Sequence, residues 1–156
     1  MTNRVIKTYE GIEGLLTVTK NSLSAIKELL IFETSYASLN DMFDKEVSEK
    51  IREEFMSKDI KIRELTNRIF HENYTKVKEF NEKVMNIRYI DPRKLAIKVE
   101  TLIYNDVVAI YQPVQNGFCI EIHSKELADQ QKQLFEFIWK ISERPIIGKG
   151  GRTSIF

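Results

Sequence analysis

The sequence is poor in the residues that build cross-links, tight metal clusters or membrane spans. It has one cysteine, two histidines, three prolines and six glycines in 156 residues. Because Cys119 stands alone, an internal disulfide and a thiolate metal cluster are both excluded. The apolar runs, such as ELLIF, are too short to cross a bilayer, and we expect no signal peptide. These absences predict a cytoplasmic protein that does not enter the membrane.

An excess of charge of either sign is also missing. The chain carries 24 basic and 23 acidic residues, for a formal net charge of +1. That balance gives no global attraction to nucleic acid or to an anionic membrane. Hydrophobic residues make up 42% of the chain, which is ordinary for a globular protein, and the length suits a single compact domain.

The first ninety residues alternate between helical and strand patterns. Apolar residues at helical spacing predict helices over 9–23, 39–59 and 72–86. Short apolar or alternating runs predict strands over 27–34, 60–67 and 87–90. This alternation favours parallel strands with helices packed on the faces of the sheet.

The second half changes to a meander of strands. Runs over 95–104, 107–113 and 117–122 read as strands, separated by hairpin-type turns at Asn105-Asp106 and at 115–117. A last helix is expected to begin after the N-cap Ser124 and to end near Ile141, before Pro145. Its buried face is expected to be formed by Leu127, Leu134, Phe135, Ile138 and Ile141, with Trp139 on another face.

These elements predict an α/β fold, a three-layer α-β-α sandwich with a mixed sheet. We expect one domain over residues 1–144, followed by a Gly-rich and loosely attached tail over 145–156.

The stretches YEGIEGLLTV, IKIRELTN, IRYID, KVETLIYNDVVAIY and GFCIEIHSKELADQQKQLFEFIWK carry a resemblance. In their order and spacing, over roughly residues 8–142, the chain resembles the C-terminal effector half of TrmB-like transcriptional regulators. That half is itself similar to a single phospholipase D-like domain. The resemblance implies a homodimer, with its interface at the meander or the last helix. It also implies contact with DNA only through a winged helix-turn-helix segment, which this sequence does not contain.

The resemblance also bears on catalysis. In active phospholipase D-like domains a strand carries a His and a Lys, and an Asp lies at the hairpin turn that follows. Asp106 takes the turn position here, but Val99 stands in the His position and Thr101 in the Lys position. Neither side chain can attack phosphorus or hold a phosphate oxygen, so the resemblance implies a domain that is not an enzyme.

A His-x-Lys pair occurs elsewhere in the chain, at His123 and Lys125, but Asp129 follows it one residue too early for the motif. Because Ser124 is expected to cap a helix, these side chains would not share one strand face.

Polar residues follow the predicted strands at their carboxyl ends, where ligands bind in open α/β sheets. We expect a polar or anionic small molecule to bind there, and the predicted ligand-binding residues are Glu33, Ser35, Tyr36, Asn67, Arg68, Glu100 and Tyr104. Helix capping and solvation explain the same residues as an alternative. With two histidines in the chain, no metal site and no cofactor are expected, and surface or cap-adjacent positions are expected for both.

Three functions remain open from the sequence. The leading hypothesis is a non-catalytic domain that senses a ligand and dimerises within a TrmB-like transcriptional regulator. The alternatives are a phospholipase D-type phosphodiesterase or nuclease, and an adaptor that dimerises without a ligand.

Overall fold

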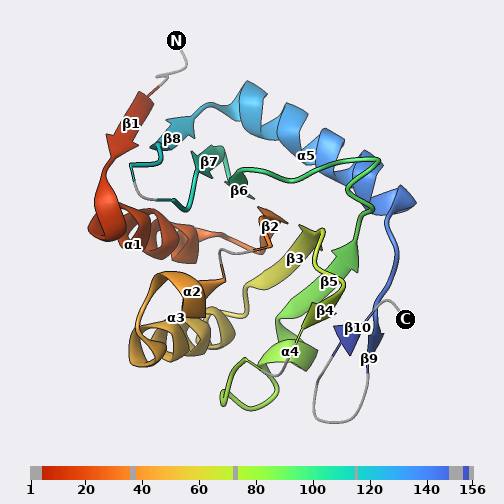
Figure 1. Cartoon of the computed structure of the whole chain (residues 1–156). Helices are drawn as coiled ribbons and strands as arrows, with labels where there is room; N and C mark the ends of the chain where they lie inside the picture. Colours follow the sequence, from red (N-terminus) through yellow and green to blue (C-terminus); the bar gives the residue numbers. More distant parts are fainter. Residues whose placement is uncertain (1–4, 36–37, 72–73, 115, 148–152, 155–156) are drawn as a thin grey trace.

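The computed structural model describes residues 5–35, 38–71, 74–114, 116–147 and 153–154. Its main feature is a mixed seven-stranded sheet with the strand order β1-β8-β7-β6-β2-β3-β5 (Figure 1). The strands of this sheet are β1 (Val5–Tyr9), β2 (Glu28–Glu33), β3 (Lys61–Thr66), β5 (Met85–Tyr89), β6 (Glu100–Tyr104), β7 (Val107–Tyr111) and β8 (Cys119–His123).

The predicted change from parallel to antiparallel strands is confirmed. β2 pairs in parallel with β3, and β3 pairs in parallel with β5. The later strands β6, β7 and β8 form an antiparallel meander, and β6 joins it to β2 in antiparallel register. As a result, the carboxyl ends of β2 and β3 meet the beginning of β6 at one edge of the sheet.

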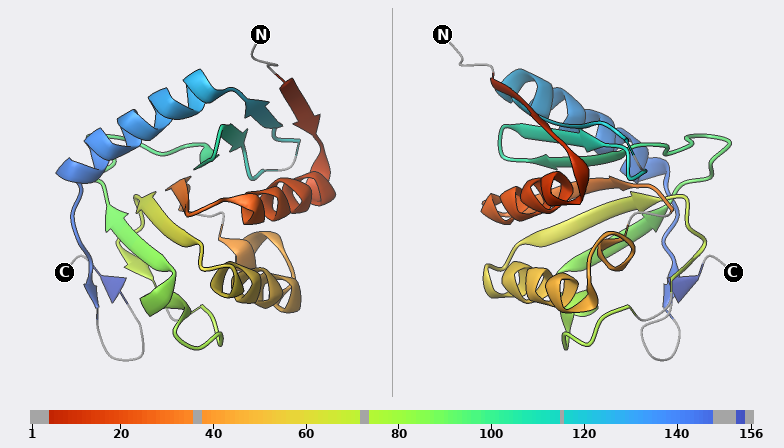
Figure 2. Two further views of the ribbon diagram at one scale, coloured as in Figure 1. Left: turned by 180° about the vertical axis from the view of Figure 1, so that it is seen from behind. Right: turned by 60° about the vertical axis from the view of Figure 1, so that its left-hand side comes forward.

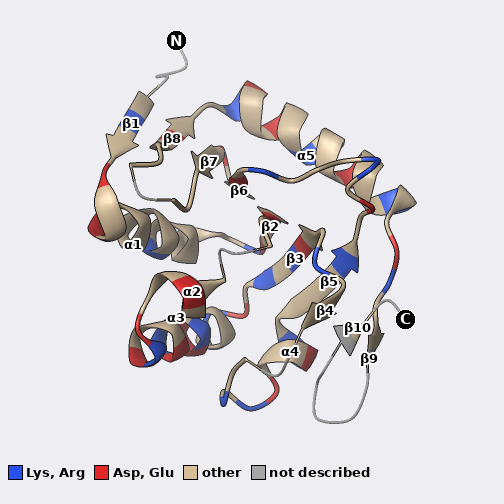
Figure 3. Ribbon diagram, in the orientation of Figure 1, with Lys and Arg blue, Asp and Glu red and all other residues tan. Residues whose placement is uncertain are grey.

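Helices cover both faces of the sheet, which confirms the α-β-α sandwich. α5 covers one face, and α1 and α3 cover the other (Figures 1 and 2). The helical segments are α1 (Gly11–Asn21), a 3-10 turn (Ser22–Ser24), α2 (Leu39–Met42), α3 (Lys45–Ser57), α4 (Phe80–Lys83) and α5 (Lys125–Ile141). Acidic and basic residues are interspersed along α3 (Figure 3). Within the described residues, no helix is long and apolar enough to span a bilayer.

The turn between β6 and β7 shows why the meander forms where the sequence predicts it. Asn105 adopts a left-handed backbone conformation with φ of 48°, which asparagine tolerates better than most residues. Its side chain accepts a hydrogen bond from the Ile26 N–H at 3.0 Å and donates one to the Ser24 carbonyl at 3.0 Å. The turn is therefore fixed to the segment that leads into β2.

The observed elements differ from the predicted ones in several places. The edge strand β1 was not predicted; it pairs with β8 from Val5 opposite His123 to Tyr9 opposite Cys119. The helix predicted over 39–59 is divided into α2 and α3, because Phe43 is extended and Asp44 begins a new helix.

The helix predicted over 72–86 is reduced to the single turn of α4. Glu79 takes a left-handed conformation with φ of 61°. The Thr75 hydroxyl and the Lys76 N–H both donate to Glu49 at 2.9 Å. These tertiary hydrogen bonds replace the local ones that a helix would have made.

The last helix begins and ends as predicted, with the Ser124 hydroxyl accepting from the Leu127 N–H, but its buried face differs. Phe135 and Trp139 are buried and stack with ring centroids 5.5 Å apart. Leu134 and Ile141, predicted to be buried, are about half exposed. Trp139 is therefore covered by its own chain.

Part of the predicted tail has regular structure. β9 (Ile146–Ile147) pairs with β10 (Thr153–Ser154), and β10 pairs with β4 (Phe70–His71) to form a second, three-stranded sheet. Through this pairing Thr153 and Ser154 lie beside the segment that follows β3.

Candidate functional site

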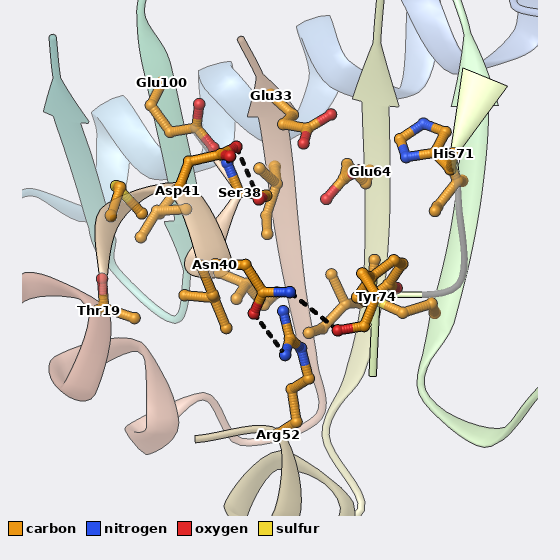
Figure 4. Close-up of a pocket in the computed structure, with 18 of the residues that line it drawn as sticks. Thr19, Glu33, Ser38, Asn40, Asp41, Arg52, Glu64, His71, Tyr74 and Glu100 are labelled. Atoms are coloured by element: carbon orange, nitrogen blue, oxygen red, sulfur yellow. Dashed lines mark hydrogen bonds between the residues drawn. The ribbon is translucent and has the colours of Figure 1, made fainter. Parts of the chain in front are cut away.

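A cavity of about 450 Å³ lies where the carboxyl ends of β2 and β3 meet the start of β6. It is on the sheet face that α2 and α3 cover (Figure 4). Apolar side chains such as Ile31, Ile62 and Leu102 form its floor. Its polar residues are Thr19, Ser22, Glu33, Ser38, Asn40, Asp41, Arg52, Glu64, Arg68, His71, Tyr74, Glu100 and Tyr111.

Three buried glutamates point into this cavity from neighbouring strands. Glu33 continues the inward face of β2 after Ile31, and Glu64 continues that of β3 after Ile62, since residues two apart on a strand share a face. Glu100 begins β6. All three are at least nine-tenths buried.

Glu100 is held in place by the end of β2. Its Oε2 accepts hydrogen bonds from the Thr34 N–H at 2.8 Å and from the Thr34 hydroxyl at 3.0 Å. Burial, followed by the nearby charge of Glu33, raises the pKa of Glu100 well above its ordinary value, although Thr34 and Arg68 oppose the shift. Burial therefore disfavours the charged form of this carboxyl group.

Glu33 and Glu64 face each other (Figure 4). Burial raises the pKa of Glu33, against the lowering influence of Arg68 and of hydrogen bonds with Thr66 and Glu64. Burial and the charges of Glu33 and Glu100 raise the pKa of Glu64 well above its ordinary value. Two carboxylates in one desolvated site repel each other, so the site favours a proton or a cation.

His71 completes this group from β4. One ring nitrogen of His71 and one carboxylate oxygen from each of Glu33 and Glu64 lie within 4.8 Å of one another. Burial, followed by the charge of Arg68, lowers the pKa of His71 to about 4. The imidazole is therefore neutral near pH 7 and keeps a lone pair for a ligand.

Arg68 is the cation beside this group. Its guanidinium Nη2 lies 3.9 Å from Glu33 Oε1 and 3.8 Å from Asp41 Oδ2. It also donates a hydrogen bond to the Ser35 carbonyl. Because two carboxylates already neutralise it, Arg68 offers little free positive charge to an anionic ligand.

The wall towards α3 is a hydrogen-bonded cluster. The buried Arg52 donates to Asn40 Oδ1 at 3.0 Å and to Glu49 Oε1 at 2.7 Å. Its guanidinium also lies over the ring of Tyr74, 4.9 Å from the centroid. Asn40 in turn donates to the Tyr74 carbonyl at 2.9 Å (Figure 4). These contacts hold the irregular segment after β4 against α2 and α3.

The structure brings together three of the seven predicted ligand-binding residues, Glu33, Arg68 and Glu100. Ser35 is exposed and contributes its carbonyl to Arg68. Tyr104 lies at the opposite end of β6 from Glu100, where burial and the nearby charge of Glu121 raise its pKa. Tyr36 lies outside the described residues.

Asn67 directly precedes the cavity residue Arg68 in the sequence, but its side chain has a structural role. Its amide nitrogen donates to the Ile90 carbonyl at 2.7 Å and to the Leu95 carbonyl at 2.9 Å. Its oxygen accepts from the Ile97 N–H at 2.8 Å. Asn67 therefore fixes the loop between β5 and β6, and all of these contacts are to backbone.

Sequence reasoning missed Glu64 and His71. A signal for Glu64 was present, because alternation along the strand places it on the same face as the apolar residues Ile60 and Ile62. A charged residue on that face is expected to be buried. His71 was expected near the surface or a helix cap, yet it is 8% exposed. No local pattern indicates that position, since it depends on the pairing of β4 with β10.

The positions that the resemblance assigns to phospholipase D-type catalytic residues lie elsewhere. Thr101 is on β6 next to Glu100, and alternate residues of a strand face opposite sides, so it faces away from the carboxyl cluster. The His-x-Lys pair, His123 and Lys125, lies at a strand-to-helix junction, as expected. His123 contacts Glu121 at 2.6 Å on β8, while Lys125 pairs with Asp129 at 2.6 Å on the exposed face of α5.

Comparison with known proteins gives a fold relationship. No protein-family model matches the chain, and no curated protein matches it by sequence. Among solved structures, it is similar to TrmBL2, an archaeal chromatin protein, with a TM-score of 0.61 and 15% identity over 89% of this chain and 52% of that one. It is also similar to NucT from Helicobacter pylori, with a TM-score of 0.64 and 11% identity over 91% of this chain and 98% of that one.

A further similarity is to Nuc from Salmonella typhimurium, a phospholipase D family member, with a TM-score of 0.63 and 8% identity over 91% and 98% of the two chains. At such low identities these similarities show a phospholipase D-like α/β fold. The chain spans about half the length of TrmBL2.

Proposed function

We propose that this chain is a non-catalytic ligand-sensing and dimerisation domain of a TrmB-like transcriptional regulator. The observation that carries the proposal is the cavity of about 450 Å³ with buried polar groups at the carboxyl ends of β2 and β3. A volume of this size suits a small molecule, and a few fixed polar groups in an apolar lining provide specificity. The fold similarity to TrmBL2 supports the regulatory context.

The lining favours a polar ligand that donates hydrogen bonds, neutral or cationic, over an anionic one. Glu33, Glu64 and Glu100 offer carboxyl oxygens, whereas Arg68 is already paired with Glu33 and Asp41. An anion would have to approach three buried carboxyl groups, which is electrostatically unfavourable.

Binding is tested by thermal unfolding of the protein with a panel of neutral, cationic and anionic small molecules. Glu100→Gln is the test variant and Glu121→Gln the matched control, because both residues are buried carboxyls but Glu121 does not line the cavity. A ligand that raises the melting temperature of the wild type and of Glu121→Gln, but not of Glu100→Gln, would support the proposal. If no compound shifts the melting temperature, the ligand-free adaptor becomes the better explanation.

A dimer is part of the same proposal. Leu134, Phe137 and Ile141 are exposed and lie three and four residues apart, so they form one stripe on the outer side of α5. We propose this stripe as the dimer surface. Phe137→Glu should then shift the molar mass measured by light scattering from dimer to monomer, whereas a monomeric wild type at micromolar concentration would refute it.

The phospholipase D-type phosphodiesterase remains the second candidate, because the fold is shared with members of that family. Hydrolysis of bis-p-nitrophenyl phosphate by the wild type, lost in His71→Gln or His123→Gln, would establish it. Val99 and Thr101 at the corresponding catalytic positions lead us to expect no turnover.

A further inference from the structure

We propose that Glu33, Glu64 and His71 form a binding site for one divalent transition-metal ion. The site goes beyond the sensing function, because metal binding is a property of this chain that requires neither a partner nor DNA. Nothing in the sequence pattern indicates it, since the three residues come from β2, β3 and β4.

The geometry is the first argument. One oxygen of each carboxylate and one imidazole nitrogen lie within 4.8 Å of one another. Ligand atoms about 2.0–2.2 Å from one ion lie about 3.0–3.5 Å apart in octahedral or tetrahedral geometry. The three atoms therefore need to approach by less than about 2 Å, which side-chain rotations can provide. Figure 4 shows all three side chains directed towards the space between them.

Unpartnered polar atoms are the second and independent argument. Among the described residues, Glu33 Oε2 and His71 Nε2 are buried and have no hydrogen-bond partner. Glu33 is 4% exposed and His71 is 8% exposed. Buried polar atoms are nearly always paired, so two unpartnered atoms in one small cluster indicate a ligand. A metal ion would accept a lone pair from each of them.

Charge gives the third argument. Glu33, Glu64 and Glu100 share this end of the sheet, and Arg68 pairs with Glu33 and Asp41. A divalent ion would neutralise two carboxylates that otherwise repel each other. Arg68, which lies beside Glu33 Oε1, would orient that ligand from outside the metal.

The donor set selects the class of ion. Magnesium and calcium prefer sites built from oxygen alone, whereas an imidazole nitrogen with carboxylates suits zinc, iron or manganese. Three protein ligands leave at least one coordination position open. That position faces a cavity of about 450 Å³, so water or an oxygen of a small molecule could complete the coordination.

The test is calorimetric titration of the wild-type protein with zinc chloride, with cobalt chloride and, for comparison, with magnesium chloride. Glu64→Gln and His71→Gln remove ligands. His123→Gln is the matched control, because the chain has two histidines and His123 pairs with Glu121 far along the sheet. We expect one ion per chain, affinity reduced at least about tenfold in both ligand variants, and unchanged affinity in the control. Far-ultraviolet circular dichroism confirms that each variant is folded.

A second measurement reports directly on the histidine ring nitrogens. Cobalt or zinc should perturb the ring ¹⁵N resonances of one histidine in the wild type, and comparison with His123→Gln identifies it as His71. Three results would overturn the proposal: no stoichiometric binding, binding lost in His123→Gln but kept in His71→Gln, or magnesium bound as tightly as zinc. A regulator without metal and a metal-binding domain without sensing would thus give different results in the metal and ligand titrations.

Discussion

Replacing Asn67 with alanine tests whether this residue fixes the fold or binds the ligand. The side chain makes three hydrogen bonds to the backbone at Ile90, Leu95 and Ile97, with distances of 2.7–2.9 Å. Each such bond contributes about 0.5–1.5 kcal/mol, so their combined loss should cost about 3 kcal/mol. This loss of stability is expected because Ile90 is buried, and its carbonyl would lose its hydrogen-bond partner.

Urea denaturation measures this change. With a slope of about 2 kcal/mol per molar urea, the midpoint should fall by about 1.5 M in Asn67→Ala. Asn67→Asp should also be strongly destabilised, because a carboxylate can accept from the Ile97 N–H but cannot donate to the two carbonyls. Asn86→Ala, at an exposed position on β5, is the control and should change stability by less than about 0.5 kcal/mol.

The same variant separates structure from binding. At a temperature where Asn67→Ala is folded, its affinity for zinc should remain close to that of the wild type. A loss of stability below about 1 kcal/mol would refute the hydrogen-bond reasoning. A folded variant that no longer binds would show instead that Asn67 belongs to the site.

Three other perturbations test the core, the free thiol and the buried carboxyl group. Phe135→Ala should lower the free energy of unfolding by about 3–5 kcal/mol, because the ring is fully buried against Phe32 and Trp139. Equilibrium urea unfolding measures this loss, and it should be much smaller in the control Phe118→Ala, because Phe118 is half exposed. Burial raises the pKa of Cys119 to about 11, which lowers the fraction of reactive thiolate. At about pH 8 its reaction with a disulfide reagent should therefore be about a hundredfold slower in the folded than in the unfolded protein. Equal rates would contradict its burial. The raised pKa of Glu100 gives the fold a contribution to stability that is fully present below the ordinary glutamate pKa and is lost as the pH rises through the folded-state value. Glu100→Gln should therefore flatten the fall in unfolding free energy measured as the pH rises above the ordinary glutamate pKa, and an unchanged slope would count against this assignment.

Local patterns determined the elements whose stability depends on one buried face. β2, β3 and the hairpin at Asn105 were predictable, because alternation or a continuous apolar run already selects the register that buries them. The N-cap Ser124 likewise placed the start of α5, because its hydroxyl satisfies a helical N–H without help from the rest of the fold. Glu33, Arg68 and Glu100 could be predicted to lie close together because strand ends in such a sheet meet at a common edge, and they line one cavity.

Tertiary structure decided everything that depends on partners distant in sequence. β1 is ordered by pairing with β8, and the segment at Thr75 follows Glu49 of α3 instead of its own helical periodicity. His71 enters the cavity because β10, some eighty residues later, pairs with β4. The carboxyl and imidazole groups of the proposed metal site carry no signal in their spacing, because strands β2, β3 and β4 bring them together only when the sheets form.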